Sequence, residues 1–136
     1  MLSELLAVPL QGILRCNIAI ERIPGVEFED ESLRDRYVAE AKFLRAYQYF
    51  DLVRYFGGVP LVLGMKMPSE VEGIQRASTA EVYTQIENDL KDAANVLPVK
   101  SEYASADLGR ATKGQHKVYW QGLSLIKKNM RKRRIW

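Results

Sequence analysis

The chain has 136 residues, of which 47% are hydrophobic and 27% are charged, which is the balance of an ordinary globular protein. This length allows one domain with a substantial core but leaves little room for two. No stretch approaches the roughly 20 apolar residues that a membrane-spanning helix needs. A single cysteine, Cys16, excludes an internal disulfide and a cysteine-based zinc site.

The net charge of +3 is unevenly distributed along the chain. Residues 113–136 contain eight lysines and arginines and no acid. Residues 1–112 therefore keep twelve basic residues against seventeen acidic ones, a net charge of −5. The alkaline isoelectric point of about 9.0 comes from the C-terminal segment alone, and the rest of the chain is mildly acidic.

The N-terminal stretch MLSELLAVPLQGILRC does not have the pattern of an export signal. It has an acid at Glu4, lacks a basic start, and places Arg15 directly before Cys16, where a lipid-attachment cysteine would follow small residues. We therefore expect neither a signal peptide nor a lipid anchor here. Apolar periodicity predicts a first helix over Pro9–Ile23, and Pro24-Gly25 ends it.

The second predicted helix has the strongest pattern in the sequence. We expect it to begin near Asp30–Ser32, with acids at the positive end of its dipole, and to run to Phe56. Gly57-Gly58 supplies a left-handed exit and Pro60 prevents continuation. Arg45 and Asp51 lie among apolar neighbours in this helix, and we interpret them as paired, partly buried residues that hold helices in register.

The remaining chain predicts two further helices with long connections. VPLVLG is apolar and extended, and MKMPSEVEGIQRAS is predicted as a loop. Ser78 and Glu81 have the spacing of a capping box at the start of a third helix, which ends at Pro98. A polar loop then leads to a fourth helix, for which Thr112 is a plausible cap.

The predicted fold is all-α, with two helix pairs in a tetratricopeptide-like arrangement joined by long loops. The second helix carries aromatic residues on more than one side, so we expect neighbouring helices to cover two of its faces. Helical spacing favours core packing over a sugar-stacking platform for these aromatics, which are Tyr37, Phe43, Tyr47, Tyr49, Phe50, Tyr55 and Phe56.

Three segments carry a resemblance to a known family. AEAKFLRAYQYFDLVRYFGGVPLV, RASTAEVYTQIENDLKDAANVLP and YASADLGRATKG follow one another in the order and spacing of the SusD/RagB-like proteins. The chain therefore resembles this family over about residues 10–114. After Gly114 the resemblance stops, where the family continues with an Ala/Leu-rich helix.

The resemblance implies a function that the residues alone do not. SusD-like proteins are Bacteroidetes outer-membrane lipoproteins with a tetratricopeptide-like scaffold. They bind glycans or other nutrients and sit over a SusC-like TonB-dependent transporter, without catalysis. We interpret residues 1–114 as a partial SusD-like scaffold of a longer, outer-membrane protein. Residues 115–136 are interpreted as an atypical basic tail from a shifted reading frame or a fused end.

Residues with chemical potential are few. The one histidine, His116, lies in the atypical tail, so we predict no catalytic residues, no metal site and no cofactor. The resemblance implies that the family holds its ligand largely through loops and later segments. Tyr103, on a predicted loop, is the one candidate ligand contact in this chain, and a weak one.

Two alternative functions remain open. A stand-alone helical-repeat module could hold a peptide or protein between its helix pairs. The run KKNMRKRRIW could bind nucleic acid or an anionic membrane, although the acidic body would repel phosphate and no nucleic-acid partner is expected. The favoured interpretation of that run is a solvated or frayed terminus.

Overall fold

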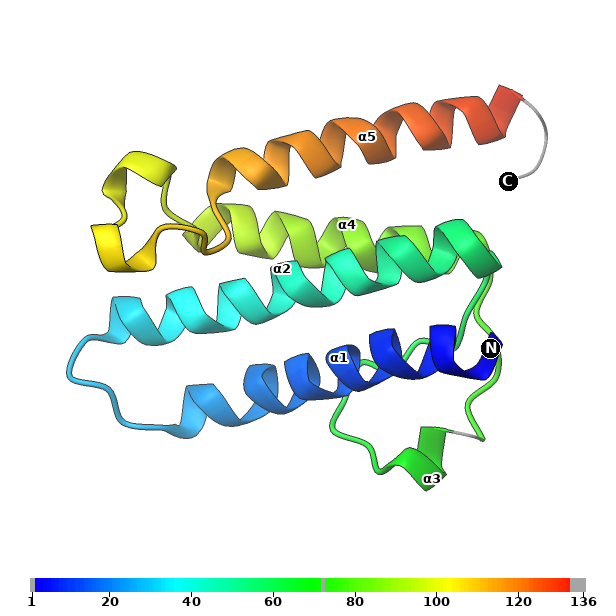
Figure 1. Cartoon of the computed structure of the whole chain (residues 1–136), viewed down its shortest axis with the longest axis horizontal. Coiled ribbons are helices and arrows are strands. Elements are labelled where there is room, and N and C mark those ends of the chain that lie inside the picture. The colour runs from blue at the N-terminus through cyan, green and yellow to red at the C-terminus, as the bar shows by residue number, and fades with distance from the viewer. Residues whose placement is uncertain (1, 72, 133–136) are drawn as a thin grey trace.

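The computed structural model describes residues 2–71 and 73–132, and consecutive long helices in it run antiparallel (Figure 1). The helices are α1 (Leu2–Arg22), α2 (Glu31–Phe56), α3 (Pro68–Val71), α4 (Thr79–Val96) and α5 (Lys113–Lys132). The first hairpin is α1 with α2, and the second is α4 with α5. The described residues contain no β-strand, so the predicted all-α class with two helix pairs is confirmed.

The long helix α2 begins and ends where the sequence predicts. Hydrogen bonds from the Ser32 hydroxyl and the Ser32 amide to the carboxylate of Asp30 cap its first turn and lower the pKa of Asp30. At the other end Gly57 adopts a φ of +70°, and its amide donates to the carbonyl of Val53 at 3.0 Å. Glycine takes this conformation at little cost, and the helix stops there.

The start of α1 differs from the prediction. The helix begins at Leu2, and Pro9 lies inside it rather than at its first turn. Leucine, alanine and glutamate, which dominate the residues before Pro9, are strong helix formers, and they extend the helix at the cost of one backbone hydrogen bond. At its C-terminal end a 3-10 turn over Ile23–Gly25 ends the helix as predicted.

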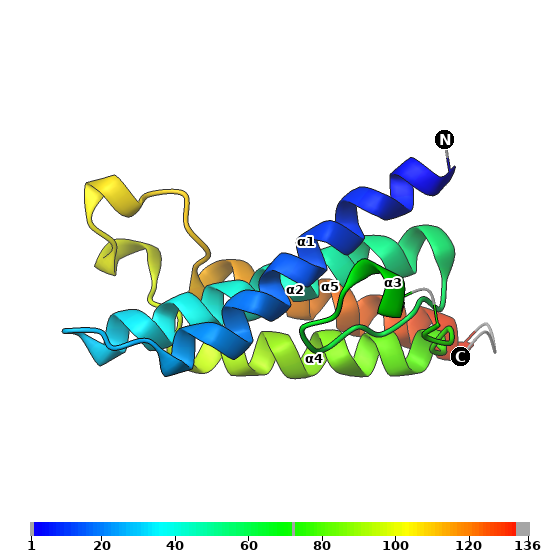
Figure 2. The same cartoon turned by 90° about the horizontal axis from the view of Figure 1, so that it is seen from below.

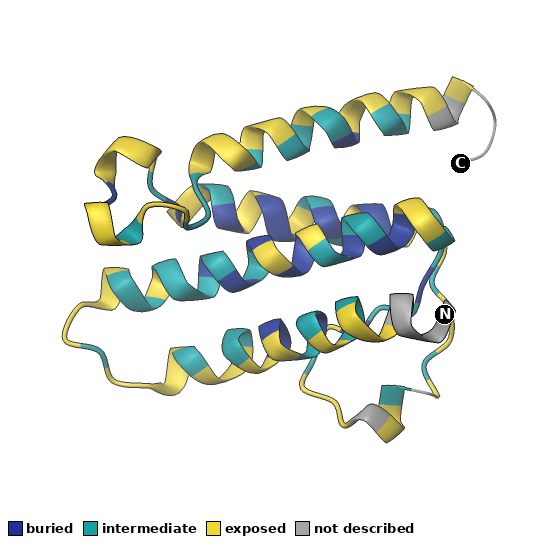
Figure 3. Cartoon of the chain, in the orientation of Figure 1, coloured by how far each residue is buried: buried dark blue, intermediate teal, exposed yellow. Residues whose placement is uncertain are grey.

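Helix α2 is covered on two sides, as its aromatic pattern predicts. It lies between α1 and α4 and packs against both. Figure 3 shows the buried positions concentrated where α2 and α4 run side by side. The buried residues of α2 are Ala39, Ala41, Phe43, Arg45, Ala46, Tyr49, Leu52 and Val53.

Not every aromatic of α2 joins the core. The Tyr55 ring is 78% exposed, so its assignment to the core was wrong. Tyr47 is 38% exposed, although its ring contacts Tyr119 of α5. Leu44 is exposed as well. These residues lie where neither α1 nor α4 covers the helix, because two neighbours cannot enclose the full circumference of a third. Phe43, Tyr49, Phe50 and Phe56 do belong to the core or pack on it.

The segment after α2 is extended and closely attached to the helices. The Tyr49 hydroxyl accepts a hydrogen bond from the Val62 amide at 2.7 Å and donates to the Val62 carbonyl at 3.2 Å. Burial raises the pKa of Tyr49 to about 12, so the hydroxyl keeps its proton at neutral pH. The Ala77 amide donates to the Val59 carbonyl at 3.0 Å. Within the predicted loop that follows, Pro68–Val71 forms the single helical turn α3, which the prediction missed.

Two reciprocal caps start the second hairpin. Ser78 and Glu81 form the predicted capping box of α4, and hydrogen bonds from Ser78 lower the pKa of Glu81. Thr112 and Gln115 exchange the same pair of bonds at the start of α5, at 3.0 and 3.3 Å. Between the two helices the 97–112 connection stands out from the helical layer (Figure 2).

The basic C-terminal segment is a packed helix in its described part. The Tyr119 ring of α5 meets Phe43, Tyr47 and Phe50 of α2 edge-on, with centroids 5.7–6.0 Å apart. Leu123 is buried in the main core, and Lys127 pairs with Glu87 of α4 at 2.5 Å. The run KKNMRKRRIW was interpreted as solvated or frayed. It is helical as far as Lys132, so it is not frayed up to that residue, whereas Lys128 and Lys132 are exposed to solvent as that interpretation expects. Residues 133–136 lie outside the described residues.

We predict that Gly58→Ala destabilises the fold. A Cβ atom at this position would lie 2.1 Å from the Ala77 carbonyl oxygen, so the connection beside α4 must move. The expected loss in free energy of unfolding is about 2 kcal/mol, measured by urea denaturation. Gly122→Ala is the control, since its Cβ meets nothing within 4 Å and removing a helical glycine should add about 0.5–1 kcal/mol. Equal effects of the two changes would contradict the clash.

Candidate functional site

Two features that define many functional sites are missing from the described residues. The described residues, 2–71 and 73–132, include no group of three or more His, Cys, Asp or Glu residues that could hold a metal ion. Within the same part of the chain, no helix combines the length and apolarity needed to cross a bilayer. The described residues also form two polar clusters that join different helices.

The first polar cluster is a buried node at the centre of the molecule. The guanidinium of Arg45 donates two hydrogen bonds to Asp89 of α4, at 2.7 and 2.8 Å, and one to the side-chain oxygen of Asn17 of α1, at 2.8 Å. The Asn17 amide in turn donates to the carbonyls of Val62 and Gly64 at 2.8 and 3.0 Å. One side chain of α2 thus ties together α1, α4 and the extended connection.

The node is closed and structural. Arg45, Asp89 and Asn17 are all buried, and each group in the network has a partner. The predicted burial and pairing of Arg45 are confirmed. Asp51 is paired and partly buried as predicted, but its partner is Arg54 of the same helix at 4.0 Å, so Asp51 does not hold helices in register. A closed network offers no group to a ligand, so its role is to fix the positions of the helices.

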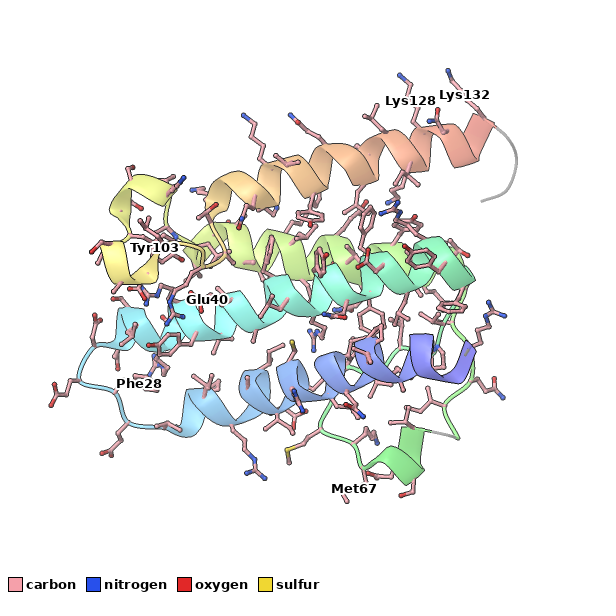
Figure 4. The ribbon with its side chains drawn as sticks, in the orientation of Figure 1. Phe28, Glu40, Met67, Tyr103, Lys128 and Lys132 are labelled. Carbon is pink, nitrogen blue, oxygen red and sulfur yellow. The ribbon has the colours of Figure 1, made fainter. Side chains whose placement is uncertain are left out.

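The second polar cluster surrounds the one residue predicted as a ligand contact. We call it the Tyr103 cluster: the N-terminal half of α2 and the 97–112 connection bring together Arg36, Tyr37, Glu40, Tyr103, Asp107 and Arg110. Figure 4 shows Tyr103 and Glu40 at the same end of the molecule, with Phe28 on its border. Arginine, tyrosine and carboxylate groups are the types that bind sugar rings and hydroxyls, by stacking and by charge-assisted hydrogen bonds.

Within the cluster most donors and acceptors already have protein partners. Arg110 donates to Asp107 at 2.7 Å and to Glu40 at 2.9 Å. The hydrogen bond to Asp107 has the largest effect in raising the pKa of Arg110, followed by the negative charge of Glu40. The Arg36 guanidinium lies over the Tyr103 ring at 5.3 Å and over the Tyr37 ring at 5.6 Å. These contacts attach the 97–112 connection to α2.

Tyr103 is mostly committed to this attachment. It is only 9% exposed, and its hydroxyl donates to the Ala111 carbonyl at 2.7 Å. Burial raises the pKa of Tyr103. The arrangement favours a positioning role for Tyr103, and direct ligand contact at this residue stays a prediction.

Two polar atoms of the cluster lack hydrogen-bond partners. Arg36 Nε and Glu40 Oε1 face each other at 3.8 Å, beyond hydrogen-bond distance, and neither has a partner although both atoms are buried. The sequence showed only the spacing of Arg36 and Glu40 on one helix, and it gave no sign that Arg110 would join them. Arg110 reaches Glu40 because the 97–112 connection folds back against α2.

Comparison with known proteins places this two-hairpin helical scaffold in a family. Residues 6–114 match the SusD-like family described as "Starch-binding associating with outer membrane". SusD-like protein P38 of Formosa agariphila is 36% identical over 110 residues, and SusD-like protein P2 of the same organism is 34% identical over 89 residues. The chain belongs to the SusD-like family, as the resemblance predicted.

Solved structures agree with this assignment. A laminarin-binding SusD-like protein matches 93% of this chain with a TM-score of 0.83 and 35% sequence identity. The surface glycan-binding protein A of Bacteroides fluxus matches 95% of it with a TM-score of 0.80 and 27% identity. The chain covers 27% of each of these two structures, and 21% and 17% of the two Formosa relatives.

We predict that Asp89→Asn lowers the free energy of unfolding by about 3 kcal/mol, because it leaves the Arg45 charge unpaired in the interior. Asp92→Asn is the matched control on the same helix, since Asp92 pairs with Lys42 at 2.5 Å on the surface, and its loss should stay below about 1 kcal/mol. Chemical denaturation measures both. The double change Arg45→Met with Asp89→Leu should cost less than the sum of its single changes; a strictly additive result would contradict the node.

We predict that Tyr103 stabilises the fold by two separable contacts. Tyr103→Phe removes only the hydrogen bond to Ala111 and should cost about 1 kcal/mol. Tyr103→Ala also removes the buried ring and should cost about 3 kcal/mol. Urea denaturation and amide hydrogen exchange of residues 98–112 report the losses. Stability unchanged by Tyr103→Ala would show that the ring has no positioning role.

Proposed function

We propose that this chain supplies the helical scaffold of a cell-surface glycan-binding protein that captures an oligosaccharide and passes it to a SusC-like TonB-dependent transporter in the outer membrane. Capture and transfer require no bond to be made or broken, so we propose no enzymatic activity. Among the described residues, neither polar cluster pairs a nucleophile with a base.

The observation that carries the proposal is the extent of the structural match. Most of the chain, from the first hairpin into the second, superimposes on a protein whose name records laminarin binding, at 35% identity. Sequence identity of this level over one continuous match supports a common role for the scaffold. Because the chain spans about a fifth of the length of its curated relatives, the glycan and the transporter are matters for experiment.

The structure supports a division of labour within such a protein. The buried Arg45 node fixes α1, α2 and α4, and the Tyr103 cluster holds the 97–112 connection against α2. A ligand group such as a sugar hydroxyl could reach the unpartnered polar atoms of Arg36 and Glu40 only if the cluster opened. On this basis the scaffold presents loops to the ligand and contributes few contacts itself.

We predict weak or absent glycan binding by the 136-residue chain alone, since its aromatic rings are largely used in packing. Isothermal titration with laminarin oligosaccharides and a panel of other glycans should give dissociation constants no tighter than about 1 mM. A chimera in which residues 6–114 replace the matching segment of the laminarin-binding relative should retain laminarin binding. A micromolar affinity of the isolated chain, or a folded chimera without binding, would contradict the scaffold role.

The partner is tested separately. The tagged chain, expressed in the organism that encodes it, should recover a TonB-dependent transporter from detergent-solubilised outer membranes. Recovery of a defined soluble protein without any transporter would favour the other interpretation, a helical-repeat module that holds a protein or peptide.

A further inference from the structure

The outward side of α5 carries basic residues. Lys117, Lys128 and Lys132 are exposed, and their spacings of eleven and four residues place them on one side of the helix. Figure 4 shows Lys128 and Lys132 pointing away from α4. The described acidic residues form no ion pair with these three lysines, whereas Lys127, on the inner side, pairs with Glu87.

Two apolar side chains lie beside the lysines. Val118 is 68% exposed and Leu125 is 63% exposed, and their spacing of seven positions puts both on the same side of the helix. The opposite side of α5 carries Tyr119 and Leu123, which pack on the core, so the outward side is available while the helix remains folded. We call the outward residues Lys117, Val118, Leu125, Lys128 and Lys132 the basic face.

Lysines next to exposed apolar side chains suit one class of partner. At an anionic lipid surface the ammonium groups meet lipid phosphates, and short apolar side chains enter the boundary of the acyl region. Nucleic acid would use the lysines but would gain nothing from Val118 or Leu125. The rest of the chain has the opposite charge, since residues 1–112 carry a net charge of −5. An anionic surface would therefore attract α5 and repel the rest of the molecule.

We propose that the basic face of α5 binds the surface of an anionic phospholipid bilayer, with α5 lying parallel to the membrane and the first hairpin directed away from it. The contact is reversible and sensitive to salt, because it rests on a few charges and two small apolar groups. It is independent of glycan capture and uses no residue of the Tyr103 cluster.

Sedimentation with vesicles tests the proposal on the 136-residue chain. Vesicles of phosphatidylcholine with about one third phosphatidylserine should bind the chain, and pure phosphatidylcholine vesicles should not. Lys128→Gln with Lys132→Gln should weaken binding about 30-fold, since each lysine near an anionic surface contributes about fivefold. Lys66→Gln with Lys100→Gln is the control, because it removes the same charge from exposed positions outside α5 and should leave binding within about twofold.

The apolar part has its own test. Val118→Ser with Leu125→Ser should weaken vesicle binding about tenfold or more without changing the melting temperature, since both side chains are exposed. Equal sedimentation with both vesicle types, or equal losses in the two lysine variants, would overturn the proposal. So would binding to a duplex oligonucleotide that persists unchanged in the serine variant while vesicle binding is absent.

Discussion

The arrangement of the helices depends on one buried charge. Arg45 brings a guanidinium into the interior of a small domain, and such a group is tolerated there only when charged and polar partners surround it. Asp89 of α4 supplies a two-bond carboxylate partner, and Asn17 of α1 supplies the remaining acceptor. Any relative shift of α1, α2 or α4 would leave at least one of these groups unpaired, so the node selects one packing of the three helices.

Around this node, α2 serves as the central element of the scaffold. Small residues such as Ala39 and Ala46 let its neighbours approach, while Phe43 and Tyr49 fill the space between hairpins. The Tyr49 hydroxyl of α2 also accepts a hydrogen bond from the Val62 amide, which holds the extended connection against the helix. A helix that packs on both sides links the two hairpins into one core, which is how helical-repeat scaffolds carry their loops at defined positions.

The two surfaces with functional potential lie at different ends of this scaffold. The Tyr103 cluster is at the end where α2 begins, and Lys128 and Lys132 are near the far end of α5 (Figure 4). A rigid body between them would let a SusD-like protein keep a membrane contact and a ligand-facing end apart. The family provides the expectation of glycan capture, and the charge pattern of α5 adds the membrane contact.

The sequence by itself determined the elements whose signals are local. The capping residues Asp30, Ser78 and Thr112 act on amides within three residues, and Gly57 ends α2 through its own backbone conformation, so these boundaries could be predicted. The need for cover on two sides of α2 could also be predicted, because apolar periodicity is a property of one helix.

Only the tertiary structure decided which residues meet across the chain. Asp89 rather than Asp51 pairs with Arg45, Arg110 reaches Glu40 seventy positions away, and Tyr55 is left outside the core. The helix that leads into the basic run packs through Tyr119 and Leu123 onto aromatics of α2 and the core, and its sequence did not indicate these partners. The side-chain types in a sequence indicate that a buried charge needs a partner or that an aromatic ring needs to be covered. Which residue becomes the partner depends on distances that exist only after the helices have packed.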